Sequence, residues 1–184
     1  MPRGGTWLQR WRVPLGFLCG GIFMWLARPR AVTLIIGLLV AVAGLALRAW
    51  AAGHIRKNAA LAVSGPYAYT RNPLYLGSFI LGLGFSVASG HPLLWALFGA
   101  LFLGIYWPVM RVEAATLVEI FGVEYENYAR AVPLFLPRLT AYRSVVSEPV
   151  KFDRALYFRY REYRASLGLA IAWSILALKA LLLR

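Results

Sequence analysis

Long apolar runs alternate with short polar segments along this chain, and the runs are long enough to cross a membrane. A spanning helix needs about 20 mostly apolar residues, and its backbone groups must pair internally because lipid offers them no partner. The short joins at 28–30 and 90–91 predict two antiparallel hairpins. The pattern predicts five transmembrane helices: Trp7–Ala27, Ala31–Leu47, Leu74–Ser89, Pro92–Met110 and Ser166–Leu183.

The distribution of charge predicts how these helices are oriented. Five spans place the N-terminus and the segments 48–73 and 111–165 on one side. That side carries all the acidic residues and all the Lys and Arg except Arg28, Arg30, Lys179 and Arg184. Because basic residues concentrate on the cytoplasmic side of membrane proteins, we expect the N-terminus and both polar segments in the cytoplasm. The C-terminus is expected on the opposite side.

Composition supports an all-α integral membrane protein. The chain is 60% hydrophobic and 15% charged, with a mean hydropathy of +0.62 and a net charge of +13. Soluble domains are nearer half apolar and a quarter charged. The basic residues lie between apolar runs, which favours membrane topology over nucleic-acid binding. We expect a single domain over residues 1–184, with a motif-bearing core at about 48–137 and a C-terminal helical part at about 148–184.

Two local patterns add expectations about packing. Gly16 and Gly20 are spaced for close helix contact within the first span. Ser147, Glu148 and Pro149 are typical of a helix start. That helix is expected to run from Glu148 through Tyr163 into the last span.

The first polar segment, Gly65 to Gly77, combines prolines, tyrosines and a helix start. Pro66 and Pro73 stiffen the backbone, and Thr70 or Asn72 is placed to cap the following helix. Such a helix start attracts carboxylate or phosphate, and tyrosine rings offer faces to a flat heterocycle or a cation. An aromatic belt at the membrane interface with a plain helix cap explains the same residues.

The second polar segment, Arg111 to Pro133, holds four glutamates. Leu117, Ile120 and Phe121 follow at helical spacing, Gly122 ends that helix, and Tyr125 and Tyr128 continue on a short second helix. Three of the glutamates are expected on a solvated face: Glu119, Glu124 and Glu126. Glu113 differs, because a carboxylate at the lipid boundary needs a partner such as Arg111, Arg71 or a cationic ligand.

Other chemistries find little support in the sequence. His54 and His91 fall on opposite sides of the expected membrane, so no cluster of metal ligands forms. The chain has no phosphate-binding loop and no glycine-rich dinucleotide motif after a strand.

Taken together, the two polar segments resemble the isoprenylcysteine carboxyl methyltransferase family, whose relatives include phospholipid methyltransferases. The resemblance covers about 48–137, and it rests on Gly65-Pro66-Tyr67, Arg71-Asn72-Pro73-x-Tyr75-x-Gly77, Arg111-x-Glu113, Phe121-Gly122-x-Glu124-Tyr125-x-x-Tyr128 and Val132-Pro133. It implies a methyltransferase that uses S-adenosyl-L-methionine without a Rossmann domain. It also implies a cofactor pocket closed by the cytoplasmic helix ends and a lipid-like acceptor that enters from the bilayer.

The resemblance also implies roles for particular residues. The family's cofactor positions correspond here to Lys57, Ala59, Ala60, Leu61, Ala62, Tyr67, Asn72, Pro73, Leu74, Tyr75 and Glu113, with His54, Arg71, Tyr125 and Tyr128 in support. Asn72 replaces a common histidine; it still forms hydrogen bonds but cannot titrate. The family arginine that holds a substrate carboxylate corresponds to Val109, and the nearest arginine is Arg111.

The chemical class of the methyl acceptor depends on which charged residue takes part in the reaction. A carboxylate acceptor is already ionised and needs a cation such as Arg111. An amine acceptor must lose a proton, and Glu113 or a tyrosine could assist that step. We expect a lipophilic carboxylate, with membrane lipids as partners and no nucleic acid. Three alternatives stay open: N- or O-methylation of a phospholipid or small lipid, a sterol-reductase-like enzyme that uses NADPH, and a lipid-binding protein without catalysis.

Overall fold

The computed structural model describes residues 18–55, 60–143 and 151–182, and this part of the chain is helical, with no strand among the described residues. Residues 18–26 are helical. The elements that follow are α2 (Ala31–Ala52), a 3₁₀ turn (Gly65–Ala68), α3 (Pro73–Ser89), α4 (Pro92–Leu101), a π-helical turn (Phe102–Tyr106), α5 (Trp107–Phe121), α6 (Val123–Ala131), α7 (Arg154–Arg159) and α8 (Tyr163–Leu182).

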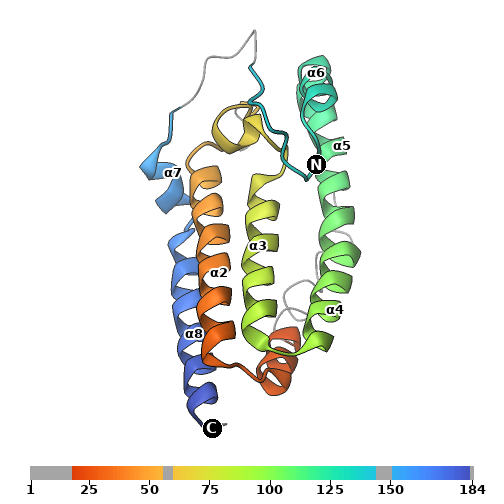
Figure 1. Ribbon diagram of the computed structural model, residues 1–184. Helices are drawn as coiled ribbons and strands as arrows, with labels where there is room; N and C mark the ends of the chain where they lie inside the picture. The colour runs from red at the N-terminus through yellow and green to blue at the C-terminus, as the bar shows by residue number, and fades with distance from the viewer. Residues whose placement is uncertain (1–17, 56–59, 144–150, 183–184) are drawn as a thin grey trace.

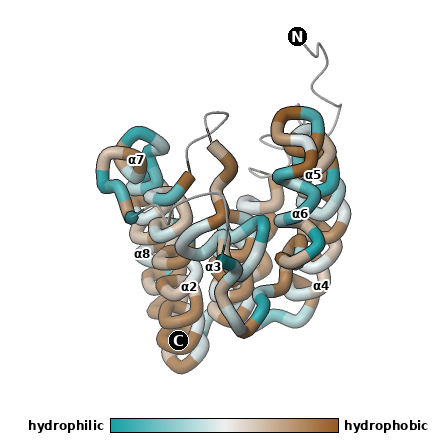
Figure 2. The backbone as a smooth tube through the Cα atoms, turned by 90° about the horizontal axis from the view of Figure 1, so that it is seen from above, coloured by the Kyte–Doolittle hydropathy of each residue, from teal (hydrophilic) through white to brown (hydrophobic). Residues whose placement is uncertain are grey.

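The long helices form an upright bundle. In Figure 1, α2, α3, α8 and the continuous α4–α5 rod run side by side. The 3₁₀ turn, α6 and α7 are all at the upper end of the bundle, with α7 and α6 on opposite sides. Seen from above in Figure 2, apolar positions dominate the helical rods and polar positions gather on α6 and α7. The bundle therefore has one polar, loop-rich end, which is where the two motif-bearing segments lie.

Three helices among the described residues are long and apolar enough to cross a membrane: Ala31–Ala52, Pro92–Phe121 and Tyr163–Leu182. The helix α3 is also apolar but has 17 residues, about 25 Å at 1.5 Å per residue. The expected first span, Trp7–Ala27, lies largely outside the described residues. The all-helical integral membrane fold is confirmed, and the count of five spans stays a prediction.

Glycines bring α2 and α3 into close contact. A methyl group on Gly84 of α3 would lie 2.6 Å from the backbone nitrogen of Ala41, and one on Gly37 of α2 would lie 2.5 Å from the Gly84 carbonyl oxygen. Gly44 of α2 and Gly77 of α3 form a similar contact about two helical turns away. On each helix the two glycines of this contact are seven residues apart, which keeps them on one face. Small residues let helix backbones approach closely in lipid.

The described part of the first span does not show the expected close glycine contact. Gly16 lies outside the described residues, and a methyl group on Gly20 would meet nothing within 4 Å among them. The tight seam of this bundle belongs instead to α2 and α3.

The fourth span continues well beyond its expected end at Met110. The helix runs without a break from Pro92 to Phe121, and Gly122, with a positive φ of 54°, ends it as expected. One turn of it is π-helical: the Trp107 N–H donates to the Phe102 carbonyl five residues earlier. Pro108 has no N–H to donate and its ring crowds the preceding turn, which accounts for the wider turn.

The expectation of one helix from Glu148 through Tyr163 is wrong for its described part. Residues 151–153 are not helical, and α7 starts after Asp153, whose carboxylate accepts a hydrogen bond from the Ala155 N–H at 2.8 Å. Arg161 has a left-handed φ of 55°, which ends α7 and turns the chain into α8. Residues 147–149, the expected start, lie outside the described part.

The glycine seam leads to a prediction about stability. Replacing Gly84 with alanine places a methyl group against the α2 backbone, so Gly84→Ala should lower the free energy of unfolding by about 1–3 kcal/mol. Thermal unfolding in detergent micelles measures this change.

Gly99→Ala is the matched control, because a methyl group there meets nothing within 4 Å. Alanine also has a helix propensity up to about 1 kcal/mol better than that of glycine, so this variant should be neutral or stabilised. Equal melting temperatures for the two variants would show that the α2–α3 approach is looser than described.

Candidate functional site

A cavity of about 550 Å³ opens at the polar end of the bundle, within the range of roughly 300–1,000 Å³ that is usual for small-molecule sites. Its walls come from the end of α2, the first turns of α3, residues 60–62, the loop residues Tyr67, Arg71 and Asn72, one face of α5, and α6. The two polar segments singled out in the sequence therefore form opposite walls of one site.

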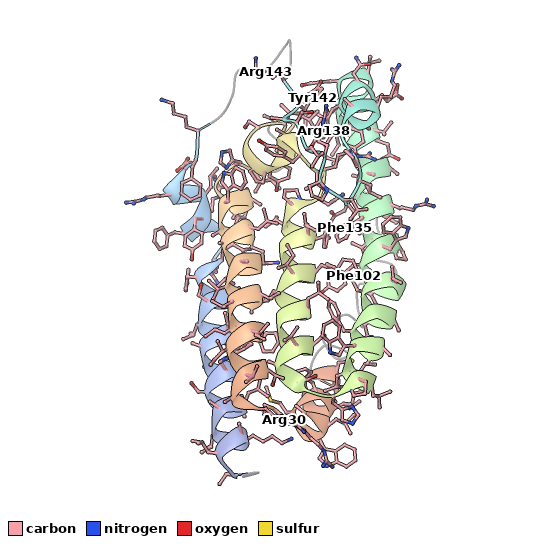
Figure 3. The ribbon with its side chains drawn as sticks, viewed as in Figure 1. Arg30, Phe102, Phe135, Arg138, Tyr142 and Arg143 are labelled. Carbon is pink, nitrogen blue, oxygen red and sulfur yellow. The ribbon has the colours of Figure 1, made fainter. Side chains whose placement is uncertain are left out.

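The first polar segment is held in place by the chain that follows α6. The Arg71 N–H donates to the Pro133 carbonyl at 3.0 Å, and the N–H groups of Arg138 and Tyr142 donate to the carbonyls of Tyr69 and Ala68, each at 2.9 Å. Figure 3 shows Arg138 and Tyr142 at this polar end. These backbone bonds fix the cavity wall without depending on side-chain identity.

Two side chains add to this attachment. They were expected to cap α3, but they bind the segment after α6 instead. Asn72 occupies the cap position of α3 but forms no side-chain cap bond; its amide donates to the Leu134 carbonyl at 2.9 Å. The Thr70 hydroxyl donates to the Phe135 carbonyl at 2.8 Å. Pro73 in the first turn removes one N–H that would need a cap, so both side chains are used to tether the loop.

Most of the residues expected at a cofactor site do line the cavity: Ala60, Leu61, Ala62, Tyr67, Asn72, Pro73, Leu74, Tyr75 and Glu113. Three of the four expected supporting residues, Arg71, Tyr125 and Tyr128, line it as well. Lys57 and Ala59 lie outside the described residues. His54 is buried beside the cavity rather than in its lining, with Nδ1 2.9 Å from the Trp50 carbonyl oxygen.

Arg111 is exposed and is not part of the cavity lining. The cavity face of α5 consists of residues at helical spacing: Glu113, Thr116, Leu117, Ile120 and Phe121. Two residues correspond to about 200° around a helix, so Arg111 lies on nearly the opposite face from Glu113. The spacing in the sequence could have shown this. The described cations at the cavity are Arg48 and Arg71.

Glu113 is joined to the opposite wall by one side-chain contact. The Tyr75 hydroxyl donates to a Glu113 carboxylate oxygen at 2.9 Å, and the Tyr75 ring meets that of Tyr106 edge-on with centroids 5.7 Å apart. The contact brings a carboxylate and two aromatic rings to one side of the cavity. Rings and carboxylates are the groups that attract an organic cation.

Two buried donors in the lining have no hydrogen-bond partner among the described residues: the Tyr67 hydroxyl and Arg71 Nε. Tyr67 is 6% exposed, while the Arg71 guanidinium also donates to the Tyr125 hydroxyl at 3.2 Å. Leaving a buried donor unpaired costs about 1–3 kcal/mol. These two atoms are therefore available to donate hydrogen bonds to acceptor oxygens.

Burial raises the pKa of Tyr67 well above its usual value, and the nearby charge of Glu113 raises it further. Its hydroxyl therefore stays protonated, and available as a donor, throughout the neutral range. Tyr128, whose pKa is also raised by burial, donates to the Tyr67 backbone carbonyl at 2.7 Å and fixes that residue in the wall.

Arg48 belongs to the site, although no sequence pattern indicated it. Arg48 lines the cavity and forms a two-pronged ion pair with Glu162, with nitrogen–oxygen distances of 2.8 to 3.1 Å. It also donates to the Ser78 hydroxyl. Glu162 is 114 residues away in the chain, and no local pattern links residues so distant.

Comparison with known proteins places this arrangement in a family. The family model described as phospholipid methyltransferase matches residues 32–124, which include α2, α3, the α4–α5 rod and most of the cavity. This chain belongs to the phospholipid methyltransferase family. The resemblance to isoprenylcysteine carboxyl methyltransferases is thereby confirmed, because that enzyme is among the relatives of this family member.

Three relatives indicate the range of the family. A cobalt-zinc-cadmium resistance protein of Cupriavidus metallidurans is 34% identical over 72% of this chain and 64% of its own length. Protein-S-isoprenylcysteine O-methyltransferase of Schizosaccharomyces pombe is 32% identical over 67% and 48%. Methanethiol S-methyltransferase of Crocosphaera subtropica is 32% identical over 39% and 27%. The chain thus spans less than two thirds of the length of each of these relatives. No solved structure matches it.

The elements that close the cavity of this family member lie partly outside the matched residues. The segment 132–142 that pins the first polar loop follows residue 124, and so does Glu162. The match therefore covers the walls, while the tethers come from the rest of the chain.

The Arg48–Glu162 pair leads to a second prediction. Glu162→Gln removes the charge from a largely buried pair and should lower the free energy of unfolding by about 1–3 kcal/mol. Glu119→Gln is the control, because Glu119 is exposed on α5 and surface changes usually stay within about 0.5 kcal/mol. Thermal unfolding of both variants in the same detergent makes the comparison. Indistinguishable melting curves would remove the ion pair from the forces that hold α8 to the site.

Proposed function

We propose that this protein transfers the methyl group of S-adenosyl-L-methionine to a lipophilic acceptor at the membrane surface, with a carboxylate as the first candidate acceptor. The observation that carries the proposal is the pair of buried donors without a described partner, Tyr67 hydroxyl and Arg71 Nε, in one cavity with Glu113. A methyl donor of this kind combines a carboxylate with a sulfonium cation, and the cavity offers complementary groups for both. Membership of a methyltransferase family supports the same conclusion.

The residues of the cavity suit that cofactor one group at a time. Tyr67 would donate a hydrogen bond to its carboxylate, which leaves the Arg71 guanidinium for the carboxylate of an acceptor. Glu113 and the rings of Tyr75 and Tyr106 would face its positive end. Ala60, Leu61 and Ala62 would form the apolar wall. Lys57 and Ala59 stay proposed contacts, because they fall between Ile55 and Ala60, which both line the cavity.

When bound, this cofactor supplies a methyl group already activated by its positive sulfur. The protein then has to exclude water and align the acceptor. A carboxylate acceptor is ionised at neutral pH, so its oxygen forms the new C–O bond as the methyl–sulfur bond breaks, and no proton has to move. Such an acceptor needs a cation beside it. Arg71 lies in the cavity and is better placed for this than the exposed Arg111.

A second acceptor class is favoured by Glu113. An amine on a phospholipid or small lipid must lose a proton to become a nucleophile, and a carboxylate in the cavity could accept it. The names of the relatives, isoprenylcysteine O-methyltransferase and methanethiol S-methyltransferase, show that the family includes both large and small acceptors. The acceptor of this chain therefore has to be argued from its own residues.

We also propose that the cavity faces the cytoplasm. The polar end of the bundle carries most of the basic residues, which the positive-inside rule places on the cytoplasmic side. The N-terminus would share that side, the C-terminus would lie opposite, and membrane lipids would surround the apolar rods.

Cofactor binding gives the first test. Tyr67→Phe removes one buried donor and should weaken the binding of S-adenosylhomocysteine about tenfold, which corresponds to the loss of roughly 1.4 kcal/mol. Tyr69→Phe, a neighbour outside the cavity lining, should bind as the wild type does. Isothermal calorimetry on the detergent-solubilised protein measures both. The absence of heat with S-adenosylhomocysteine, or binding of NADPH in its place, would contradict the proposal.

Methyl transfer distinguishes the two arginines. Arg71→Lys keeps the charge but loses the flat, two-pronged guanidinium, so the rate with carboxylate acceptors should fall about tenfold or more. Arg111→Lys should leave that rate within about twofold because changes on an exposed surface are usually small. Labelled S-adenosyl-L-methionine and a straight-chain carboxylic acid in mixed micelles provide the assay. The reverse ranking would return the carboxylate-holding role to Arg111.

A further inference from the structure

Aromatic rings fill the space between α3 and the α4–α5 rod directly next to the cavity. Phe79 of α3 lies at the centre, with its ring centroid 4.7 Å from that of Phe102, 5.4 Å from Phe98 and 5.6 Å from Phe135. The rings of Phe102 and Phe135 are themselves 5.3 Å apart. Figure 3 shows Phe102 and Phe135 close together between the two rods.

These rings come from three separate parts of the chain, and each is held in place. Phe102 begins the π-helical turn and is 3% exposed. Phe135 belongs to the segment that tethers the first polar loop, and its carbonyl accepts the Thr70 hydroxyl bond. The rings therefore form a fixed barrier, because a ring on a tethered backbone has few other positions to adopt.

The barrier is continuous with the proposed reaction site. The ring of Phe102 stacks on that of Tyr106 at 5.2 Å with planes 16° apart. Tyr106 lines the cavity and meets Tyr75, which is hydrogen-bonded to Glu113. The π-helical turn enables this stack, since it alters the angular spacing between positions 102 and 106 relative to a regular helix.

We propose that the rings of Phe79, Phe102 and Phe135 form the floor of the acceptor site and restrict the enzyme to acceptors with short apolar chains. The inference rests on the methyl-transfer function proposed above. A long acyl or isoprenoid chain that extends from the reacting group into the space between α3 and α4 would meet these rings, which are in contact with one another. A compact acceptor enters through the open mouth of the cavity and needs no such passage.

The wild-type protein provides a test that depends on no variant. Straight-chain carboxylic acids, thiols and amines, from butyl to hexadecyl, are presented in mixed micelles at equal surface concentration, with labelled S-adenosyl-L-methionine as donor. For the reacting group that is accepted, kcat/KM should fall about tenfold or more from butyl to hexadecyl, since even one methylene that a pocket cannot hold costs roughly tenfold or more. A hexadecyl acceptor that reacts as well as the butyl one would overturn the inference, because the rings would then part to admit the chain.

Opening the floor should shift this preference. Phe102→Ala and Phe135→Ala remove rings from the barrier, so the ratio of hexadecyl to butyl kcat/KM should rise about tenfold. Phe85→Ala is the matched control: Phe85 is an aromatic residue of α3 that contacts Phe23 and Trp173 instead, and its ratio should match the wild type. Phe135→Leu provides a milder change if an alanine variant does not fold. An unchanged ratio in a folded floor variant contradicts the inference.

Binding of S-adenosylhomocysteine distinguishes a failure of the proposed function from a failure of the chain-length inference alone. Calorimetry should give the wild-type affinity for each floor variant, because no ring of the floor belongs to the cavity lining. Wild-type protein that neither binds S-adenosylhomocysteine nor methylates any acceptor would overturn the proposed function and the inference with it. Protein that binds and methylates with a flat chain-length profile would overturn the inference alone.

Discussion

The site depends on the attachment of the loop before α3 to the segment after α6. Their backbone hydrogen bonds join residues 68–71 to residues 133–142, and the side chains of Thr70 and Asn72 add two more. A proline-rich loop cannot satisfy its carbonyls by forming a helix, so it takes partners from another part of the chain. Without this attachment the α3 wall and the α5 wall of the cavity would be joined by the distant turn at Gly90 and by side-chain contacts such as that of Tyr75 with Glu113.

Two features of the rods set the shape of the cavity. The α2–α3 pair is tight because glycines bring the backbones together, which leaves α3 one free face toward α4 and α5. On that side the rods are separated by rings and not by small residues. One face of α3 is packed tightly against α2, and aromatic rings fill the space between its other face and the α4–α5 rod. The cavity lies at the polar end of that space, with the rings below it.

The chemistry follows from what this pocket leaves unpaired. Most polar groups around it have partners: Tyr128 holds Tyr67, Tyr75 holds Glu113, and Arg48 holds Glu162. Tyr67 hydroxyl and Arg71 Nε are the exceptions among the described buried side chains. Because burial keeps Tyr67 protonated, both atoms act as donors at neutral pH. An acidic group of a ligand is the complement that a buried pair of this kind selects.

The sequence alone determined the fold class, the start of α2, the ends of α3 and α8 to within about three residues, and the stop at Gly122. Most of the described residues expected at a site line the cavity, and their roles stay predictions. These features follow from local physics: apolar run length, proline and glycine at helix ends, and spacing along one helix face. The tertiary structure decided that Arg111 lies away from the cavity, that Arg48 and Glu162 are paired, that α7 is separate from α8, and that Phe135 reaches the floor between the rods. Contacts across 114 residues, or between a loop segment and a membrane helix, leave no periodic trace in the sequence. They depend on how completed helices pack and not on neighbouring residues in the chain.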